Sequence, residues 1–269
     1  MPELPEVETV RRGIAPEIIG RRIVAVFVRQ RRLRRLVPAG LGKKITGLSV
    51  VGVYRRAKYL IIVLDSCALL VHLGMSGALR IGSSPPKAKH EHIGWALDNG
   101  KHLLYSDPRR FGLVLLAEKC FEKHPLLEHL GCEPLTRDFN GQVLHAAWRG
   151  KKMPVKTALL AGKTVVGVGN IYASESLFDA CIRPQTAAGK ISAKRCAVLA
   201  AAIKSVLRRA IRAGGSTLRD FVDGHGQPGM FQMKWRVYGR DGSHCRCGAV
   251  IRKIFQSGRA TYYCPRCQR

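Results

Sequence analysis

Acidic residues are scarce in this sequence of 269 residues, which has 18 Asp and Glu against 46 Lys and Arg and a net charge of +28. Such an imbalance indicates a polyanionic partner, above all nucleic acid, and predicts binding that weakens steeply as salt rises. An anionic membrane surface would also attract the chain, but the sequence has no lone amphipathic helix and no lipidation signal.

Long apolar runs are also missing, and none approaches the roughly 18 residues that a membrane span needs. The N-terminus is acidic where a secretory signal peptide would be basic, so the chain is expected to stay in the cytoplasm. The sequence has no P-loop, and the G-x-G at Gly167–Gly169 lacks the third glycine and the downstream acid of a dinucleotide site. Because 46% of the residues are hydrophobic, the chain is globular and can form one large or two modest domains.

Several of the few acidic residues gather at the N-terminus, in the string MPELPEVETVRR. If Met1 is removed, Pro2 becomes a secondary amine that can attack an electrophilic carbon. An α-amino group has a pKa of about 7.7–8.0, so a useful fraction of it is neutral at working pH. Attack at a sugar C1′ would give an iminium, which acidifies the neighbouring proton and opens a route to elimination.

Pro5 is expected to begin a helix whose N-terminal end carries Glu3 and Glu6, one as general acid and the other as electrostatic partner of the cation. Arg11 and Arg12 would lie in its last turn. Acids first and bases last are also ordinary complements of the helix dipole, so this pattern alone does not establish catalysis.

Short apolar runs separated by Gly, Pro or Ser fill the first half of the chain and predict a β-sandwich or barrel. The expected strands are Ile23–Val28, Ile45–Tyr54, Tyr59–Leu64, Ala68–Leu73, Ala78–Ile81, Ile93–Leu97, Leu103–Tyr105 and Leu113–Leu116.

The pattern becomes helical from about Lys119, and Asn170 is a credible N-cap within this half. The expected helices are Leu126–Leu130, Arg137–Gly150, Val155–Leu160, Ile171–Ala180 and Ser192–Ala213.

Nine cysteines divide into single ones and a C-terminal cluster. The single ones are expected to be small buried hydrophobes in a reducing compartment, whereas the cluster indicates a metal site. Cys264 and Cys267 form one zinc knuckle, and Cys247 lies upstream at about the spacing of a zinc ribbon. The fourth ligand is either His244, slightly preferred because it keeps the two-residue spacing to Cys247, or Cys245, which keeps four thiolates. Four ligands leave no open position, so zinc would be structural.

Five motifs together resemble the bacterial formamidopyrimidine-DNA glycosylases: MPELPEVETVRRG, AKYL, HLGMSG, DPRRFG and VVGVGNIYASE. The resemblance covers essentially the full chain. It departs at the first zinc knuckle, where the family's Cys-x-x-Cys is one residue short. It implies an α+β fold of two domains, with an N-terminal β-sandwich that carries an N-terminal helix, and a C-terminal helical domain with a helix-two-turn-helix and a zinc-ribbon β-hairpin. The implied divisions are a catalytic domain 1–131, a linker 132–152, a helix-two-turn-helix domain 153–235 and a zinc finger 236–269.

The resemblance also implies roles for individual residues. Pro2 would displace the base, Glu3 would be the general acid at the sugar ring oxygen, Glu6 would organise the N-terminal amine, and Lys58 would meet the phosphate and the damaged base. Met75, Arg109 and Phe111 would fill the gap left by the flipped-out nucleotide, which offsets an extrusion cost of a few kcal/mol. The expected DNA contacts are His90, His92, Arg109, Lys152, Asn170 and Arg259.

The implied function is a bifunctional DNA glycosylase and abasic-site lyase that removes oxidised purines, 8-oxoguanine opposite cytosine or formamidopyrimidines, through a Schiff base and β,δ-elimination. The implied partner is double-stranded DNA bound by a monomer, with one structural Zn²⁺ and no organic cofactor. The loop Gly224–Gly229 would close over the extruded base, and Arg219 is singled out beside it. Two alternatives stay open: an endonuclease VIII-like enzyme that prefers oxidised pyrimidines, and a zinc-ribbon DNA-binding protein without catalysis.

Overall fold

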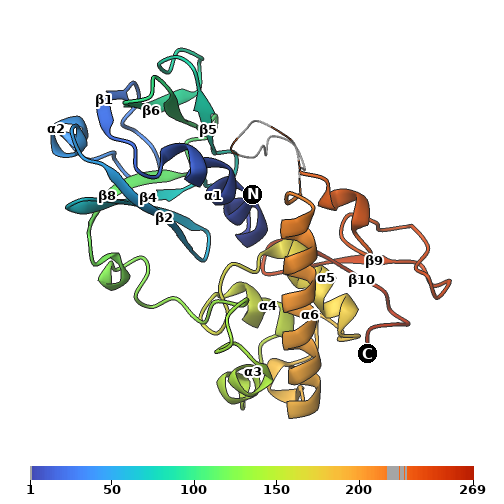
Figure 1. Cartoon of the computed structure of the whole chain (residues 1–269). Coiled ribbons are helices and arrows are strands. Elements are labelled where there is room, and N and C mark those ends of the chain that lie inside the picture. Colours follow the sequence, from blue (N-terminus) through green and yellow to red (C-terminus); the bar gives the residue numbers. More distant parts are fainter. Residues whose placement is uncertain (1, 217–223, 225–226, 228) are drawn as a thin grey trace. The chain divides into compact units, whose positions relative to one another are not determined.

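The computed structural model describes residues 2–216, 224, 227 and 229–269, which form two compact units (Figure 1). Unit 1 comprises 1–128 with 213–232, and unit 2 comprises 129–212 with 233–269. The expectations for Met1, for Arg219 and for most of the loop 224–229 fall outside the described residues.

Unit 1 is built on two antiparallel four-stranded sheets, ordered β1-β6-β7-β5 and β2-β3-β4-β8. The strand-rich first half predicted from the short apolar runs is therefore confirmed. The strands are β1 (Ile23–Val28), β2 (Val50–Arg56), β3 (Tyr59–Leu64), β4 (Cys67–His72), β5 (Ala78–Gly82), β6 (Glu91–Leu97), β7 (His102–Ser106) and β8 (Leu113–Glu118).

Helix α1 (Leu4–Ile18) packs against this β-structure and contacts β2, β3 and β5. Val7, Val10 and Ile14 recur at helical spacing and are buried in one core with side chains of both sheets. The apolar spacing continues to the buried Ile18, so the helix is longer than the N-terminal string suggested. The expectation that Arg11 and Arg12 lie in its last turn is therefore wrong.

Two further segments of unit 1 differ from the sequence-based expectations. The run beginning at Ile45 starts inside the short helix α2 (Leu41–Ile45), and the strand begins only at Val50. The helix expected at Leu126–Leu130 is a series of turns that follows the 3-10 helix η1 (Phe121–Lys123). Five residues between Pro125 and Gly131 are too few to repay the cost of helix nucleation.

Unit 2 is mainly helical, and the predicted α+β class is confirmed for the chain. Asn170 is the first residue of α5 and Gly169 its N-cap, so the predicted cap is one residue off. Among the described residues, no helix is both long and apolar enough to cross a membrane. The elements are α3 (Gly141–Trp148), α4 (Val155–Leu160), α5 (Asn170–Asp179), η2 (Ala188–Lys190), α6 (Ala193–Arg212), η3 (Phe231–Lys234, which begins in unit 1) and the hairpin β9 (Arg252–Gln256) and β10 (Arg259–Tyr263).

Candidate active site and metal centre

The start of α1 buries two carboxylates directly behind Pro2. Pro2 is itself buried, and Glu3 and Glu6 are each 2% exposed. One oxygen of Glu6 accepts the backbone N–H of Glu3 at 2.8 Å, and the other accepts the N–H of Ser216 at 2.8 Å. The first turn of a helix favours such anions because its N–H groups point toward them. Glu6 therefore fixes the backbone next to Pro2.

Lys58 occupies a two-residue turn with Ala57 between β2 and β3, since Arg56 pairs with Tyr59. It is half-buried, and its positive charge acts on His72 at the end of β4. Burial, with Lys58 and Arg34 as further causes, lowers the pKa of His72 to about 4, so the ring is neutral at physiological pH. His72 Nδ1 accepts the N–H of Gly74 at 2.9 Å, which anchors the loop that follows.

Met75, Arg109 and Phe111 come from two loops that buried Asp107 joins. Its carboxylate accepts Ser76 Oγ at 2.9 Å from one loop and the N–H of Gly112 at 2.8 Å from the other. The Arg109 guanidinium lies 4.7 Å from the centre of the Phe111 ring. Met75 is 41% and Phe111 45% exposed, so both apolar side chains are available to a partner. The structure thus brings the three predicted duplex-filling residues together.

A pocket of about 310 Å³ lies beside these side chains, lined by Arg34, His72, Gly74, Met75 and Phe111. Arg34 belongs to the basic run 29–35. Its backbone N–H donates to the carbonyl of Gly112 at 3.1 Å. The run is therefore attached to the loop that carries Phe111.

The two expected histidine contacts differ in exposure. His90 is exposed, whereas His92 is 7% exposed and its Nε2 donates to the carbonyl oxygen of Asp107 at 2.8 Å. His92 thus supports the turn that begins at Asp107.

In unit 2, the carbonyl oxygen of Ala260 accepts two hydrogen bonds from the helical region. Asn170 Nδ2 donates to it at 2.9 Å, and Lys156 Nζ at 3.1 Å. Lys156 is fully buried and also donates to Thr261 Oγ1 at 2.8 Å. Arg259, which precedes Ala260, is exposed where β10 begins after its hairpin turn. The helical region therefore holds the hairpin at the residue next to Arg259.

The C-terminal cysteines form a compact group, since the sulfur atoms of Cys245, Cys247, Cys264 and Cys267 lie within 4.8 Å of one another. The Cys245–Cys267 and Cys247–Cys264 sulfur pairs are 3.8 and 3.5 Å apart. Four thiolates bound to zinc at about 2.3 Å in a tetrahedron would be separated by about 3.8 Å. These residues therefore fit a zinc ion whose coordination shell they complete.

The preference for His244 as fourth ligand is corrected by this geometry. His244 is exposed and its backbone pairs with Val250, whereas the N–H of Cys245 donates to the carbonyl of Ala249 at 2.9 Å. This tight turn directs Cys245 inward and leaves His244 on the outside.

Comparison with known proteins matches three successive families to the chain. The formamidopyrimidine-DNA glycosylase N-terminal domain matches residues 1–114, and the formamidopyrimidine-DNA glycosylase H2TH domain matches 130–222. The zinc finger found in FPG and IleRS matches 246–269. The chain belongs to the formamidopyrimidine-DNA glycosylase family.

Relatives named formamidopyrimidine-DNA glycosylase are similar along their whole length. The one from Syntrophotalea carbinolica is 52% identical over 271 residues and the one from Burkholderia multivorans 53% over 276, each covering 100% of both chains. Among solved structures, a Lactococcus lactis FPG variant in complex with Fapy-dG-containing DNA superposes with a TM-score of 0.92 at 35% identity over 100% of both chains. The Lactococcus lactis FPG in complex with abasic-site DNA superposes with 0.91 at 35% identity over 99% of both.

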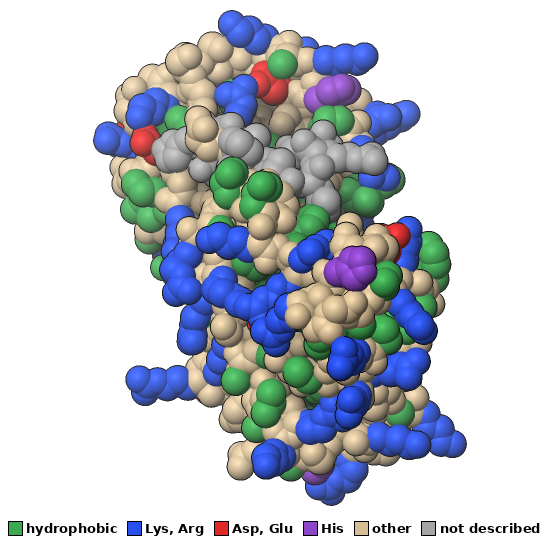
Figure 2. Space-filling view, turned by 90° about the vertical axis from the view of Figure 1, so that its right-hand side faces the viewer, with side chains coloured by type: hydrophobic (Ala, Val, Ile, Leu, Met, Phe, Trp, Pro, Cys, Tyr) green, Lys and Arg blue, Asp and Glu red, His purple; other side chains and the backbone are tan. Residues whose placement is uncertain are grey.

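Lys and Arg side chains cover much of the face drawn in Figure 2, and acidic ones are few there. This distribution agrees with the net charge of +28. A surface of this kind attracts the phosphates of DNA regardless of sequence.

Sequence analysis missed some groups that shape the site of this chain. Lys156 looks like any helix lysine, and Glu175 like any acid of α5. Glu175 is 2% exposed and accepts the backbone N–H groups of Arg236, Val237 and Tyr238 at 2.9, 3.0 and 2.8 Å. Burial keeps the pKa of Glu175 above its ordinary value despite these bonds. Lys156 stands in the largely apolar run 154–160, whereas Glu175 lies between Ser174 and Ser176 and gives no such signal.

Proposed function

We propose that this chain removes oxidised purines from double-stranded DNA and then cleaves the strand at the resulting abasic site. The observation that carries the proposal is a buried Pro2 backed by Glu3 and Glu6, in the unit that also holds Lys58, Met75, Arg109 and Phe111. Family membership, with relatives above 50% identity over the whole chain, supports the same chemistry.

The first step is displacement of the base by the N-terminal amine, once Met1 has been removed. Pro2 nitrogen forms a bond to C1′ while the bond from C1′ to the base nitrogen breaks, and the proton that Pro2 nitrogen loses is taken up by the leaving base. Glu3 donates a proton to the sugar ring oxygen as its bond to C1′ opens, which gives the iminium, or Schiff base. Glu6 keeps the amine in place through the backbone of Glu3.

Elimination then cuts the strand. The iminium acidifies the C2′ proton, whose loss expels the 3′ phosphate, and a second elimination expels the 5′ phosphate. Lys58, in its turn beside the end of β4, contacts phosphate and the damaged base.

We assign base extrusion to Met75, Arg109 and Phe111. Phe111 and Met75 fill the space that the nucleotide leaves, and Arg109 hydrogen-bonds the orphaned base. An aromatic wedge and an arginine are suited to offsetting the few kcal/mol that unstacking and unpairing cost.

The remaining DNA contacts are assigned to His90, Lys152, Asn170 and Arg259. His90, Lys152 and Arg259 are exposed, and Asn170 lies at a helix N-terminus whose N–H groups suit a phosphate. His92 acts through the Asp107 turn. We also propose the division into 1–131, 132–152, 153–235 and 236–269, a cytoplasmic and nucleoid location, and a monomer that carries one structural zinc.

Oxidised pyrimidines are a second substrate class to test. The Lactococcus lactis FPG, 35% identical to this chain, has been solved in complex with DNA that contains an oxidised pyrimidine. We expect this chain to act faster on 8-oxoguanine opposite cytosine than on such a pyrimidine, because relatives above 50% identity are named formamidopyrimidine-DNA glycosylase.

The test is borohydride trapping on a duplex with 8-oxoguanine opposite cytosine, followed by peptide mapping of the adduct. A covalent complex at Pro2 is expected. Pro2→Gly and Glu3→Gln should abolish strand cleavage while they keep salt-sensitive binding. If protein whose mass shows that Met1 is gone binds the duplex but forms no adduct, the chain is a non-catalytic DNA-binding protein and not an enzyme. If trapping is faster on a duplex with an oxidised pyrimidine than on the 8-oxoguanine duplex, the chain has the substrate preference of an endonuclease VIII-like enzyme.

A further inference from the structure

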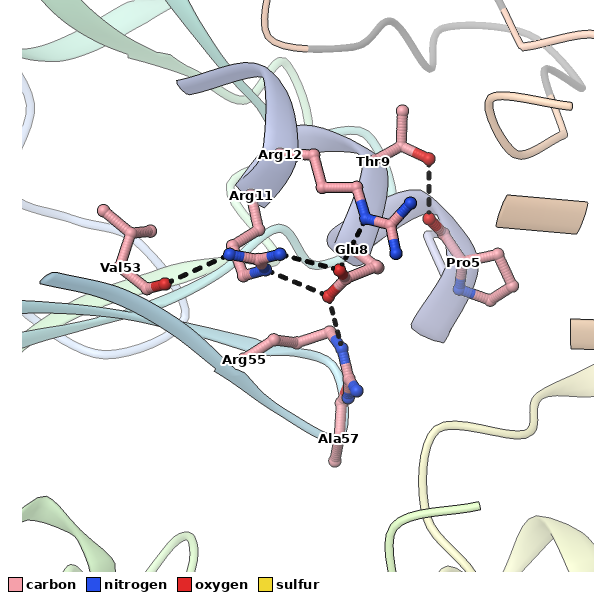
Figure 3. A network of polar contacts seen from close by, with 8 residues as sticks. All are labelled: Pro5, Glu8, Thr9, Arg11, Arg12, Val53, Arg55 and Ala57. Carbon is pink, nitrogen blue, oxygen red and sulfur yellow. Dashed lines mark hydrogen bonds and ion pairs between the residues drawn. The ribbon is translucent and has the colours of Figure 1, made fainter. Parts of the chain in front are cut away.

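Glu8 of α1 collects three arginines around one carboxylate (Figure 3). Arg11 Nη2 and Arg12 Nε donate to one of its oxygens at 2.9 and 2.8 Å, and Arg55 Nε donates to the other at 3.2 Å. The Glu8 side chain is only 12% exposed. Burial opposes its ionisation, but the hydrogen bonds from Arg11 and Arg12 and the charges of Arg11 and Arg55 hold its pKa below the ordinary value.

Arg55 differs from the other two arginines because it belongs to β2 and reaches a second group. Its Nη1 donates to the carbonyl oxygen of Ala57 at 3.0 Å, and its side chain is 10% exposed. One guanidinium therefore connects the helix that carries Glu3 and Glu6 with the residue that precedes Lys58. Arg11 reinforces this link, since its Nη1 donates to the carbonyl of Val53 in β2 at 3.4 Å.

The turn that Arg55 holds is one that alanine does not favour. Ala57 has a φ of 54°, in the left-handed region where residues other than glycine are uncommon. It is also buried, and Lys58 follows it directly before β3. A two-residue hairpin loop requires a positive φ at its first residue, which alanine adopts only with strain. The bond from Arg55 to the Ala57 carbonyl is one of the contacts that hold the turn in this conformation.

We propose that Glu8 and Arg55 form a strut that sets the position of Lys58 relative to the N-terminal end of α1. The inference rests on the proposed roles of Pro2 and Lys58. Glu8 and Arg55 are positioning residues in it, since they act through the turn and do not touch the reacting atoms.

The test compares Arg55→Met with Arg12→Met. Both remove one arginine from Glu8, but Arg12 is 60% exposed and is not among the residues that join Glu8 to the turn. We expect Arg55→Met to slow single-turnover cleavage of an 8-oxoguanine duplex at least about tenfold, with the Kd for that duplex changed less than threefold. Arg12→Met should stay within about twofold of the unaltered protein in both measurements.

A rescue and a substrate-free readout separate positioning from simple loss of stability. Glycine adopts a positive φ without penalty, so Ala57→Gly added to Arg55→Met should restore the rate severalfold, whatever happens to Tm. Amide hydrogen exchange at Lys58 and Tyr59 should become at least about tenfold faster in Arg55→Met and stay unchanged in Arg12→Met.

Equal rates and equal exchange in the Arg55 and Arg12 variants would overturn the strut. So would a slower Arg55→Met that Ala57→Gly leaves unrescued and whose rate falls only in proportion to its folded fraction. If the unaltered protein forms no adduct at Pro2, the proposed function fails, and the exchange experiment still decides whether Arg55 holds the turn.

Discussion

At the scale of single residues, Phe111 is where the cost of base extrusion should be most visible. Its ring is 45% exposed and lies under the Arg109 guanidinium. Stacking of a base on an aromatic side chain contributes about 1–3 kcal/mol, which corresponds to roughly 5- to 150-fold in rate. Phe111→Ala should therefore slow single-turnover excision of 8-oxoguanine opposite cytosine by about 10- to 100-fold.

The same variant provides its own control on a second duplex. When the lesion faces an abasic site, no base pair has to be opened, so the defect of Phe111→Ala should shrink to a few-fold. An equal defect on both duplexes would mean that Phe111 acts in the chemistry or the fold and not in extrusion.

His72 should make the stability of the protein depend on pH. Its pKa is about 4 in the folded protein, below the roughly 6.5 of an unfolded chain. As pH falls from about 6.5 to about 4, the unfolded state takes up the proton first, so stability that is present above this window is lost within it.

The comparison is with His72→Asn, whose side-chain oxygen can accept the N–H of Gly74 but cannot titrate. Urea unfolding of both proteins between pH 8 and pH 4.5 gives the difference in their free energies of unfolding, in which other titrating groups cancel. That difference should be constant above about pH 7 and should move against the unaltered protein below it. A difference that stays flat with pH would contradict the depressed pKa.

At the scale of elements, the loop after β4 can only take its shape with glycine at position 74. Gly74 has a φ of +61°, and a Cβ there would lie 2.4 Å from the backbone nitrogen of Gly112. Gly100 offers a matched control, because its φ is +78° but nothing lies within 4 Å of an added Cβ. Both alanine variants should lose about 1 kcal/mol to the backbone conformation. Gly74→Ala should lose at least about 1 kcal/mol more in thermal unfolding and should cleave more slowly, because Phe111 must shift.

The zinc hairpin is the second element whose shape should depend on a few side chains. Four cysteines surround the metal position, and Lys156 and Asn170 hold Ala260. Removing zinc with a strong chelator should leave the β-sandwich of unit 1 folded but weaken binding to lesion DNA at least about tenfold. The reason is that the hairpin that carries Arg259 loses its fixed conformation without the metal. Circular dichroism and a binding assay would check this, with zinc added back as control. If metal-free protein binds as tightly as zinc-loaded protein, the hairpin does not contribute to DNA binding.

Elements with a clear period were predictable from sequence, and those decided by tertiary contacts were not. The strand at 23–28 and the helix at 155–160 match their predicted bounds, because the strand is an unbroken apolar run and the buried Val155, Ala158 and Leu159 recur at helical spacing. Helix α2 was missed because only Leu41 and Ile45 of its five residues are buried. Asn170 was misplaced at the cap because its side chain serves Ala260, ninety residues along the chain.

The same contrast holds for the site. Pro2, Lys58 and Phe111 could be proposed from sequence because each stands in a motif that resembles the family. Glu8 and Lys156 act through contacts 47 and 104 residues apart, which a single sequence does not reveal. The choice between His244 and Cys245 needed the direction of a turn that both residues share.

At the scale of the whole molecule, the charge of +28 should govern affinity for any DNA. Each phosphate that a cation neutralises contributes about −0.9 to the slope of log K against log salt. Lys152 is exposed and proposed as a phosphate contact, so Lys152→Met should reduce the magnitude of that slope by about 1 and weaken binding equally for damaged and undamaged duplexes.

Lys101 is the matched control for this prediction. It is exposed like Lys152, but its ammonium pairs with Glu17, so Lys101→Met removes one charge from the molecule without removing a proposed phosphate contact. If net charge alone set the affinity, the two variants would weaken binding alike. If individual phosphate contacts set it, only Lys152→Met changes the slope, because counterions are released where a cation meets a phosphate. Fluorescence anisotropy over about 50 to 300 mM salt distinguishes the two cases. Equal slopes of log K against log salt for the two variants would show that Lys152 does not contact a phosphate.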